Sequence, residues 1–380
     1  MKNILVTGGA GFIGTNFVYY WLNKYPEDHV LVLDALTYAG NRANLTEAEK
    51  NPNFEFVHGN ILDQPLVETL IKNHKIATLV HFAAESHVDR SIHGPDEFIN
   101  TNIVGTHTLL KAAKKVWLDE NHQPHRFHHI STDEVYGSLK PDDPPFTEIT
   151  SYTPNSPYAA SKASSDHLVR AYHETYGLQT SISNCSNNYG PYQFPEKLIP
   201  LIITNILNGK SLPVYGDGKQ IRDWLYVDDH NLGVDLILAK GRIGQTYNIG
   251  GNNEWANIDI VKTICNLIHE RVSRSKDLLK RYPNCTSAIG NHPETLITHV
   301  KDRLGHDRRY AINAEKISSE LGYSPAHSFE TGIRNTLKWF LEKEDWWRRI
   351  MDGSYSNWIA VNYDDPKEIE NDKGTAGSFI

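Results

Sequence analysis

The sequence predicts an α/β protein, with a doubly wound parallel sheet in its first half and a smaller C-terminal lobe. Two observations lead to this prediction. Short runs of apolar residues alternate with longer stretches of helical periodicity up to about residue 186, and that alternation is typical of a parallel sheet with helical crossovers. From Asn187 onward, turn residues such as Gly216 and Gly218 interrupt the pattern, which indicates a second and less regular lobe.

Six apolar runs have the length of strands, at residues 4–6, 29–33, 54–57, 78–82, 127–130 and 180–183. Helical periodicity separates them over residues 12–25, 64–74, 96–117 and 157–176, and two further helices are expected at 197–207 and 259–271. Because each long helix connects two strands, every crossover can be right-handed and can cover one face of the sheet.

The expected domains follow from these elements. Residues 1–186 would form the sheet domain, with 228–256 returning to it, and residues 187–227 and 257–345 would form the substrate-binding lobe. Residues 346–380 are interpreted as a C-terminal extension. Its last part, from Asp364, lacks periodicity and is expected to be disordered.

Composition excludes several classes of function. With 38 Lys and Arg against 46 Asp and Glu, the formal charge is −8, which argues against a nucleic-acid partner or an anionic membrane surface. No apolar run approaches the ~18 residues of a membrane span, and the N-terminus lacks a secretory pattern, so a cytoplasmic location is expected. The 3 cysteines and 19 histidines have no ligand-like spacing, and neither a disulfide nor a metal site is predicted.

A glycine-rich loop follows the first expected strand. Gly8, Gly9, Gly11 and Gly14 fit the spacing that lets backbone N–H groups approach a pyrophosphate at the start of a helix. Asp34 ends the second strand 34 − 14 = 20 residues after the last glycine, where a carboxylate can bond a ribose 2′-hydroxyl. Together these features predict a dinucleotide-binding Rossmann domain.

The charge of Asp34 also separates the two nicotinamide dinucleotides. An anion at this position repels a 2′-phosphate, so the sequence predicts NAD rather than NADP as the cofactor. Arg42 is the nearby residue that could reverse this preference.

A helix is expected to begin at Ser156 and Pro157, which makes Tyr158 and Lys162 neighbours on one helical face. An adjacent ammonium, and an oxidised nicotinamide where one is bound, would favour the phenolate and make Tyr158 a usable base. A Tyr-x-x-x-Lys pair alone is common on helix surfaces. Combined with a dinucleotide loop, it predicts a catalytic pair.

Two adjacent acids, Asp133 and Glu134, follow Thr132 where the fifth strand ends. A solvated turn would explain them, but beside a cofactor and Tyr158 they can act as a general acid and a general base. Neighbouring residues converge on one site only if the chain turns here. Asp133 must also keep its proton near neutral pH, which a second carboxylate beside it favours.

The glycine loop, the Tyr158-x-x-x-Lys162 pair and the Thr132-Asp133-Glu134 segment resemble the extended short-chain dehydrogenase/reductase superfamily. Longer stretches resemble the dTDP-glucose 4,6-dehydratase family within it, from residue 1 to about 363. They are residues 36–40, 83–91, 128–137, 187–191, 194–198 and 222–227.

The resemblance implies a nucleotide-sugar lyase that converts dTDP-glucose to dTDP-4-keto-6-deoxyglucose. Hydride would pass from sugar C4 to NAD while Tyr158 takes the O4 proton, water would leave across C5 and C6, and hydride would return to C6. Glu134 would take the C5 proton and Asp133 would protonate the departing O6, while Thr132 bonds O4. NAD would therefore stay tightly bound.

Binding residues are carried over by position from the same resemblance. For the cofactor they are Gly8, Gly11, Phe12, Ile13, Gly14, Asp34, Ala35, Leu36, Thr37, Asn60, Ile61, Phe82, Ala83, Ala84, Ser86, Thr101, Tyr158, Lys162 and Asn188. For the sugar nucleotide they are Ser86, Thr132, Asn187, Lys197, Leu198, Pro213, Tyr215, Arg222, Asn257, Asp302, Arg303 and His306. Arg222 is the candidate for the diphosphate, because a guanidinium can bond two oxygens at once. The chain departs from the family pattern at Asn60 and at Leu304, where aspartate and proline are usual.

Three other functions share some of these features. A UDP-sugar 4-epimerase has the same loop and Tyr-x-x-x-Lys pair but needs no acid pair, and a GDP-mannose dehydratase would favour a basic residue at the position of Asp34. An NAD-sensing regulator would need none of the catalytic side chains. The resemblance further implies a homodimer in which helices 96–117 and 157–176 of each subunit form a bundle.

Overall fold

The structure is a computed structural model that describes residues 2–120 and 123–351. The chain divides into two compact units. Of the described residues, the first unit contains those up to Gln193, Tyr215–Ile260 and Lys301–Thr336, and the second contains Phe194–Val214, Val261–Val300 and residues 337–351.

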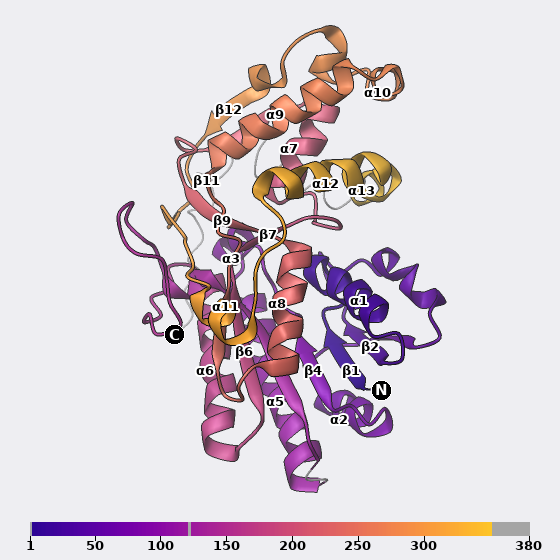
Figure 1. The fold of residues 1–380 in the computed structure, drawn as a ribbon, viewed down its shortest axis with the longest axis vertical. Coiled ribbons are helices and arrows are strands. Elements are labelled where there is room, and N and C mark those ends of the chain that lie inside the picture. The colour runs from indigo at the N-terminus through magenta and orange to yellow at the C-terminus, as the bar shows by residue number, and fades with distance from the viewer. Residues whose placement is uncertain (1, 121–122, 352–380) are drawn as a thin grey trace, which may run out of the picture. The chain divides into compact units, whose positions relative to one another are not determined.

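A seven-stranded parallel sheet forms the centre of the first unit, with the strand order β10-β6-β5-β4-β1-β2-β3 (Figure 1). Its strands are β1 (Asn3–Thr7), β2 (His29–Asp34), β3 (Phe54–His58), β4 (Thr78–His81), β5 (Arg126–Thr132), β6 (Thr180–Cys185) and β10 (Thr246–Ile249). All six runs that the sequence predicted as strands lie in this sheet, and the doubly wound α/β fold is confirmed.

Helices cover both faces of this sheet (Figure 1). One face carries α1 (Phe12–Lys24), α8 (Val227–Lys240) and α11 (Glu315–Leu321), and the other carries α2 (Gln64–Asn73), α5 (Thr106–Lys114) and α6 (Pro157–Tyr176). The helix predicted at 96–117 is present, but it begins as α4 (Asp96–Phe98) and contains two π-helical segments, η3 (Ile99–Gly105) and η4 (Lys115–Glu120).

Strand residues alternate between two hydrophobic cores. In β1, Ile4 and Val6 pack into the core under α1 and α8, whereas Leu5 packs into the core under α2 and α5. In β2, Val32 and Leu33 divide between the cores in the same way. Because both faces are buried, these strands are continuous apolar runs rather than alternating ones.

The first unit also contains a three-stranded sheet and short helical segments. The sheet has the order β11-β9-β7, from β7 (Asn187–Tyr189), β9 (Ile221–Tyr226) and β11 (Glu254–Ala256). The helical segments are η1 (Arg42–Leu45), η2 (Ala48–Lys50), α3 (Val88–His93) and η5 (Asp133–Tyr136).

The second unit is mainly helical, with the two-stranded sheet β12-β8. Its elements, two of which begin in the first unit, are α7 (Leu198–Leu207), β8 (Leu212–Tyr215), α9 (Asn257–Ser273), α10 (Lys276–Arg281), η6 (Thr286–Ile289), η7 (Pro293–Leu296), β12 (Ile297–Val300), α12 (Phe329–Glu342) and α13 (Glu344–Met351). Within it, the Trp347 indole donates to the Phe340 carbonyl (2.9 Å) and the Arg281 guanidinium donates to the Leu341 carbonyl (2.6 Å).

Residues 227–249 supply α8 and β10 to the first unit. The assignment of a cofactor domain and a substrate lobe stays a prediction. The last part of the expected C-terminal extension, 352–380, lies outside the described residues.

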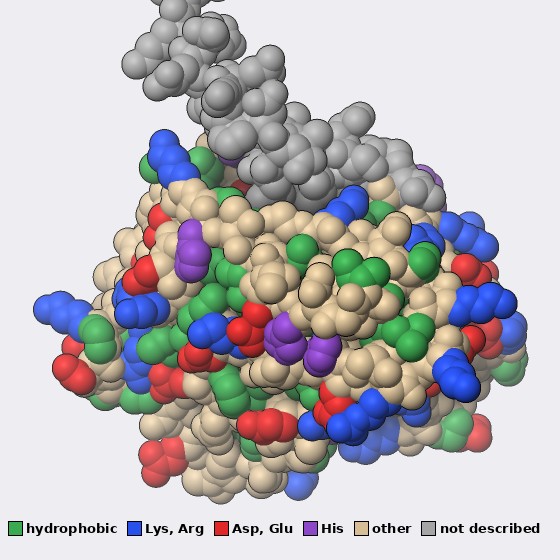
Figure 2. Space-filling view, turned by 90° about the horizontal axis from the view of Figure 1, so that it is seen from above, with side chains coloured by type: hydrophobic (Ala, Val, Ile, Leu, Met, Phe, Trp, Pro, Cys, Tyr) green, Lys and Arg blue, Asp and Glu red, His purple; other side chains and the backbone are tan. Residues whose placement is uncertain are grey.

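Basic and acidic side chains are interspersed on the face that Figure 2 shows. Within residues 2–120 and 123–351, no helix combines the length and the apolar character that crossing a bilayer requires.

Candidate functional site

The candidate site lies at the carboxyl edge of the large sheet, where the strand order reverses. β2 and β3 lie on one side of β1 in the sheet, and β4 and β5, which come later in the chain, lie on the other side. Ligands of open α/β sheets bind at such a switch point. Here Thr7 of β1 pairs with His81 of β4, so the loops after both strands start side by side.

The glycine loop fills the β1 side of this edge. Gly8 has a φ of +73°, and a Cβ added there would lie 2.5 Å from the backbone nitrogen of Ala83. A Cβ on Gly14, in the first turn of α1, would lie 2.2 Å from the Gly8 carbonyl oxygen. Only glycine fits at these two positions, and the backbone cradle that results suits a dinucleotide pyrophosphate.

Asp34 ends β2 and connects it to the loop. Its carboxylate accepts hydrogen bonds from the backbone N–H groups of Ala10 (2.9 Å) and Leu36 (2.8 Å). Burial raises the pKa of Asp34, and these two N–H donors act in the opposite direction. Each carboxylate oxygen keeps a second lone pair that could accept a bond from a sugar hydroxyl.

Arg42 contacts two side chains outside the glycine loop. Its Nε donates to Glu49 (2.9 Å), and its guanidinium stacks 4.9 Å from the centre of the Phe56 ring. The residue that could have reversed the preference for NAD is therefore engaged with other side chains.

The remaining predicted cofactor residues lie in or near α1, after the ends of several strands, in β7 and in η3. Phe12 and Ile13 lie in the first turn of α1, and the side chain of Asn60 accepts from the backbone N–H of Leu62 (2.9 Å). The Asn188 amide donates to the Ser186 carbonyl (2.9 Å). The others follow the ends of β2, β3 and β4 or lie in η3, namely Ala35, Leu36, Thr37, Ile61, Phe82, Ala83, Ala84, Ser86 and Thr101.

The acid pair begins η5, directly after the end of β5. The backbone therefore turns at this point, as the convergence of two neighbouring acids on one site requires. The Thr132 hydroxyl caps this turn by accepting from the Glu134 N–H (3.3 Å). Asp133 is 1% exposed, and among the described residues its Oδ2 has no hydrogen-bond partner. Burial, and then the charge of Glu134, raise the pKa of Asp133 well above its usual range. This is the direction that a proton donor requires, and the protonated state of Asp133 stays a prediction.

Tyr158 and Lys162 lie in the first turns of α6, which Ser156 caps by accepting from the Ala159 N–H (3.1 Å). Lys162 donates from Nζ to the Ile130 carbonyl (2.8 Å), and burial lowers its pKa to about 8. The expectation that the ammonium lowers the pKa of Tyr158 is not met. Burial and then the charge of Glu134 raise the pKa of Tyr158 well above its usual range.

Several predicted substrate residues of the first unit are held by their neighbours. Arg222 is 7% exposed, donates to the carbonyls of Ile221 (2.8 Å) and Asp307 (3.0 Å), and stacks on Tyr310 at 4.1 Å. Asp302 accepts from His306 (2.6 Å). Burial and then the charges of Glu134 and Asp223 raise the pKa of Asp133, and the buried guanidinium of Arg222 acts in the opposite direction.

Polar atoms without a partner among the described residues mark other predicted positions. The Oδ1 atoms of Asn187, Asn188 and Asn257 are buried and have no hydrogen-bond partner in the described part of the chain. Three further predicted residues belong to the second unit: Lys197 directly precedes α7, Leu198 begins it, and Pro213 lies in β8.

Sequence reasoning missed two buried carboxylates. Asp89, in α3, forms an ion pair with Arg303 and accepts from the Tyr215 hydroxyl (3.3 Å). Asp166, in α6, lies one turn after Lys162 and is 2% exposed. The i, i+4 spacing of Lys162 and Asp166 was a signal that could have identified the second residue.

Metal chemistry receives no support from the side chains. Among the residues that the structure describes, no cluster of three or more His, Cys, Asp or Glu side chains could hold a metal ion.

Comparison with known proteins relates the whole chain to nucleotide-sugar enzymes. The family model described as GDP-mannose 4,6 dehydratase matches residues 5–336. A dTDP-glucose 4,6-dehydratase of Escherichia coli is 54% identical over 93% of this chain and 97% of its own length. The enzyme of that name from Neisseria meningitidis serogroup B is 52% identical, over 93% and 98%.

Solved structures agree with these relatives. The dTDP-glucose 4,6-dehydratase of Bacillus anthracis, in complex with NAD, has a TM-score of 0.79 and 45% identity and covers 92% of this chain and 100% of its own. The Streptomyces venezuelae enzyme with NAD and TYD bound has a TM-score of 0.81 and 46% identity, with the same coverage. A UDP-glucose 4-epimerase of Thermotoga maritima, at 27% identity and a TM-score of 0.76, covers 90% of this chain and 100% of its own. The chain belongs to the dTDP-glucose 4,6-dehydratase family of the extended short-chain dehydrogenase/reductase superfamily.

Proposed function

We propose that this protein converts dTDP-glucose to dTDP-4-keto-6-deoxyglucose with NAD as a bound cofactor. The observation that carries the proposal is the pair Asp133 and Glu134, which begins η5 directly after β5 and acts electrostatically on Tyr158. Relatives that share half of this sequence bear the dehydratase name.

The cofactor proposal rests on the fit of the glycine cradle and of Asp34. The backbone after β1 packs so closely at Gly8 and Gly14 that no Cβ fits at either position, and Asp34 offers an anionic acceptor at the end of β2. When bound, NAD supplies the acceptor for the hydrogen that leaves sugar C4 and the donor that delivers it to C6. The charge of Asp34 and the engagement of Arg42 with Glu49 both favour NAD over NADP.

Tyr158 is proposed to take the O4 proton, and the hydroxyl of Thr132 to orient O4. The raised pKa of Tyr158 means that a nearby positive charge has to favour its phenolate for this step. Lys162, which belongs to the same helical face, is the cation of the chain that is closest in sequence. Oxidation at C4 acidifies the hydrogen on C5, and elimination can then follow.

Elimination needs one base and one acid. Glu134 is proposed to take the C5 proton, and Asp133 to protonate the departing O6. The raised pKa of Asp133 supports this division, because a carboxyl group that keeps its proton near neutral pH can act as the acid.

The sugar nucleotide is proposed to bind predicted residues of the first unit. The diphosphate is assigned to Arg222 and Arg303, and Asn187, Tyr215 and Asn257 are proposed to bind the remainder. Arg222 supports this assignment because a guanidinium stays protonated even when it is buried and can bond two phosphate oxygens at once.

A homodimer and a cytoplasmic location are further parts of the proposal. Ile99 and Val104 in η3 (each 43% exposed) and Tyr176 in α6 (49% exposed) expose apolar surface on the two helices that would form the bundle. Light scattering that gives a mass near 43.1 kDa at working concentration would contradict the dimer.

The test is direct. Purified protein is incubated with dTDP-glucose, and the alkali-induced absorbance of a 4-keto sugar is measured. Substrate deuterated at C4 should yield product with the label at C6 of the same molecule. Formation of a C4 epimer without the keto absorbance would instead identify an epimerase.

A further inference from the structure

A buried carboxylate lies one helical turn beyond the Tyr158-Lys162 pair, and the mechanism above does not use it. We propose that Asp166 is a positioning residue: it is the counterion that keeps the buried Lys162 side chain charged and held against β5. The inference rests on the proposed function, because it assigns a role to Lys162 within that site.

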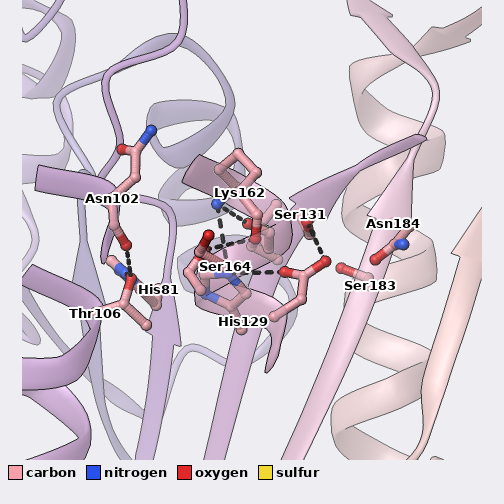
Figure 3. Close-up of polar contacts among 12 residues, drawn as sticks. His81, Asn102, Thr106, His129, Ser131, Lys162, Ser164, Ser183 and Asn184 are labelled. Carbon is pink, nitrogen blue, oxygen red and sulfur yellow. Dashed lines mark hydrogen bonds and ion pairs between the residues drawn. The ribbon is translucent and has the colours of Figure 1, made fainter. Parts of the chain in front are cut away.

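Lys162 extends from α6 toward the sheet (Figure 3). It is 4% exposed; its Nζ donates to the Ile130 carbonyl (2.8 Å) and lies 3.5 Å from Nε2 of His129. A carbonyl dipole and a neutral ring do not replace the hydration that an ammonium loses on burial. A buried ammonium of this kind needs a carboxylate close by to stay protonated.

Asp166 meets that need from the same helix. Its Oδ2 accepts from the hydroxyls of Ser131 (2.8 Å) and Tyr152 (3.0 Å), and its Oδ1 lies 3.2 Å from Nε2 of His129. Hydrogen bonds to a carboxylate favour its ionised form. Burial raises the pKa of Asp166 to about 6, while Lys162 and the two hydroxyl donors act against that shift, so the group is ionised at neutral pH.

His129 connects the two side chains without adding a charge. Burial, together with Lys162, lowers the pKa of His129 well below its usual range, so the ring is neutral. Its Nε2 is near both Lys162 Nζ and Asp166 Oδ1, and a neutral imidazole nitrogen can either accept from the first or donate to the second.

Most other titratable groups around the pair are neutral. His81 of β4 is neutral because burial lowers its pKa, and Cys185 of β6 is neutral because burial raises its pKa to about 12. Tyr136 and Tyr152 face Asp166 as neutral phenols, and His167 also acts on it from α6. Among the groups that raise the pKa of Lys162, Asp166 has the largest effect.

The test compares the unmodified protein with Asp166→Asn, which keeps the size of the side chain and removes its charge. The pKa of Lys162 is read from the NMR shift of its labelled side chain, identified by its absence from Lys162→Met. It should fall from about 8 by at least about one unit, which is a tenfold change in protonation. The alkaline limb of the turnover profile should move down by the same amount.

Asp229→Asn is the matched control. Asp229 of α8 is equally buried and accepts from the backbone N–H groups of Ala326 (2.9 Å) and His327 (3.0 Å). Its replacement should reduce thermal stability and leave the Lys162 midpoint unchanged. Loss of turnover by the same factor at every pH in Asp166→Asn, with the midpoint still near 8, would show a merely structural role and overturn the proposal.

A second variant serves if Asp166→Asn does not fold. Tyr152→Phe removes one hydroxyl donor to Asp166 and should raise its pKa above about 6, so the acid limb of turnover should move to higher pH. An acid limb that does not move would contradict the inference. If the unmodified protein has no dehydratase activity, the proposed function is overturned. The difference in the Lys162 pKa between the unmodified protein and Asp166→Asn, measured by NMR, still tests the pairing of Lys162 with Asp166.

Discussion

Asp133 and Glu134 are consecutive residues, and the burial of the first together with the charge of the second favours the protonated form of Asp133. Asp133 is buried at the end of β5, whereas Glu134 is half-buried, and both burial and this neighbouring charge raise the pKa of Asp133. The raised pKa of Asp133 is the direction that the proposed general acid requires.

Replacement of Asp133 by Asn should slow elimination and spare the oxidation at C4. Loss of a general acid typically costs about 10²–10⁴ in rate. Single-turnover mixing should show reduced cofactor accumulating in the variant, measured by its absorbance, before keto product forms. Equal slowing of both steps would refute the separate roles of Asp133 and Tyr158.

The same substitution should stabilise the fold in a pH-dependent way. Because the folded-state pKa of Asp133 is raised, the native state binds more protons than the unfolded state above pH ~4, and its stability falls as pH rises toward the folded pKa. Asp133→Asn should exceed the unmodified protein by about 0.5 to 2 kcal/mol in free energy of unfolding at pH 7. Denaturant titrations should converge for the two proteins below pH ~4, and a constant difference across this range would contradict the raised pKa.

Gly14→Ala should weaken NAD binding by at least about tenfold, because the added methyl group would force the loop away from the Gly8 carbonyl. Calorimetric titration with NAD measures the change. Gly94→Ala is the control: its Cβ would meet the Arg90 carbonyl oxygen at 3.9 Å, an ordinary contact, so NAD affinity should not change.

Asp34→Asn should reduce the preference for NAD over NADP. The variant loses a charged acceptor for the ribose hydroxyls, worth about 1.5 to 3 kcal/mol, and no longer repels a 2′-phosphate. The ratio of the two dissociation constants is the readout. Arg42→Ala should leave that ratio unchanged because Arg42 pairs with Glu49, and a large shift there would show that Arg42 reaches the cofactor.

The regular elements of the sheet were predictable because their signals are local. Both faces of β1 and β2 are buried, so each strand is an uninterrupted apolar run, and Ser156 with Pro157 marks the start of α6 to the residue. The short strands β7, β9 and β11 and the edge strand β10 have no such signal. Their positions depend on pairing with distant strands rather than on their own periodicity.

Functional residues were likewise predictable where their spacing alone identifies them, as in the glycine loop and the Tyr158-x-x-x-Lys162 pair. The direction of the Tyr158 pKa was not. Burial of Tyr158 and the charge of Glu134 reversed the expected direction of the Tyr158 pKa, because desolvation and nearby charge depend on which distant segments surround a group.

The sequence by itself determined the first six strands and the long helices between them, the loop that only glycine can form and the types of side chain at the site. Only the tertiary structure decided that Asp133 is buried beside Glu134 and that Arg42 is engaged with Glu49. It also decided that the Asp166 carboxylate and the Lys162 ammonium both lie near Nε2 of His129. The reason is physical: local propensity acts over a few neighbouring residues, whereas burial and charge act through space between segments that the fold brings together.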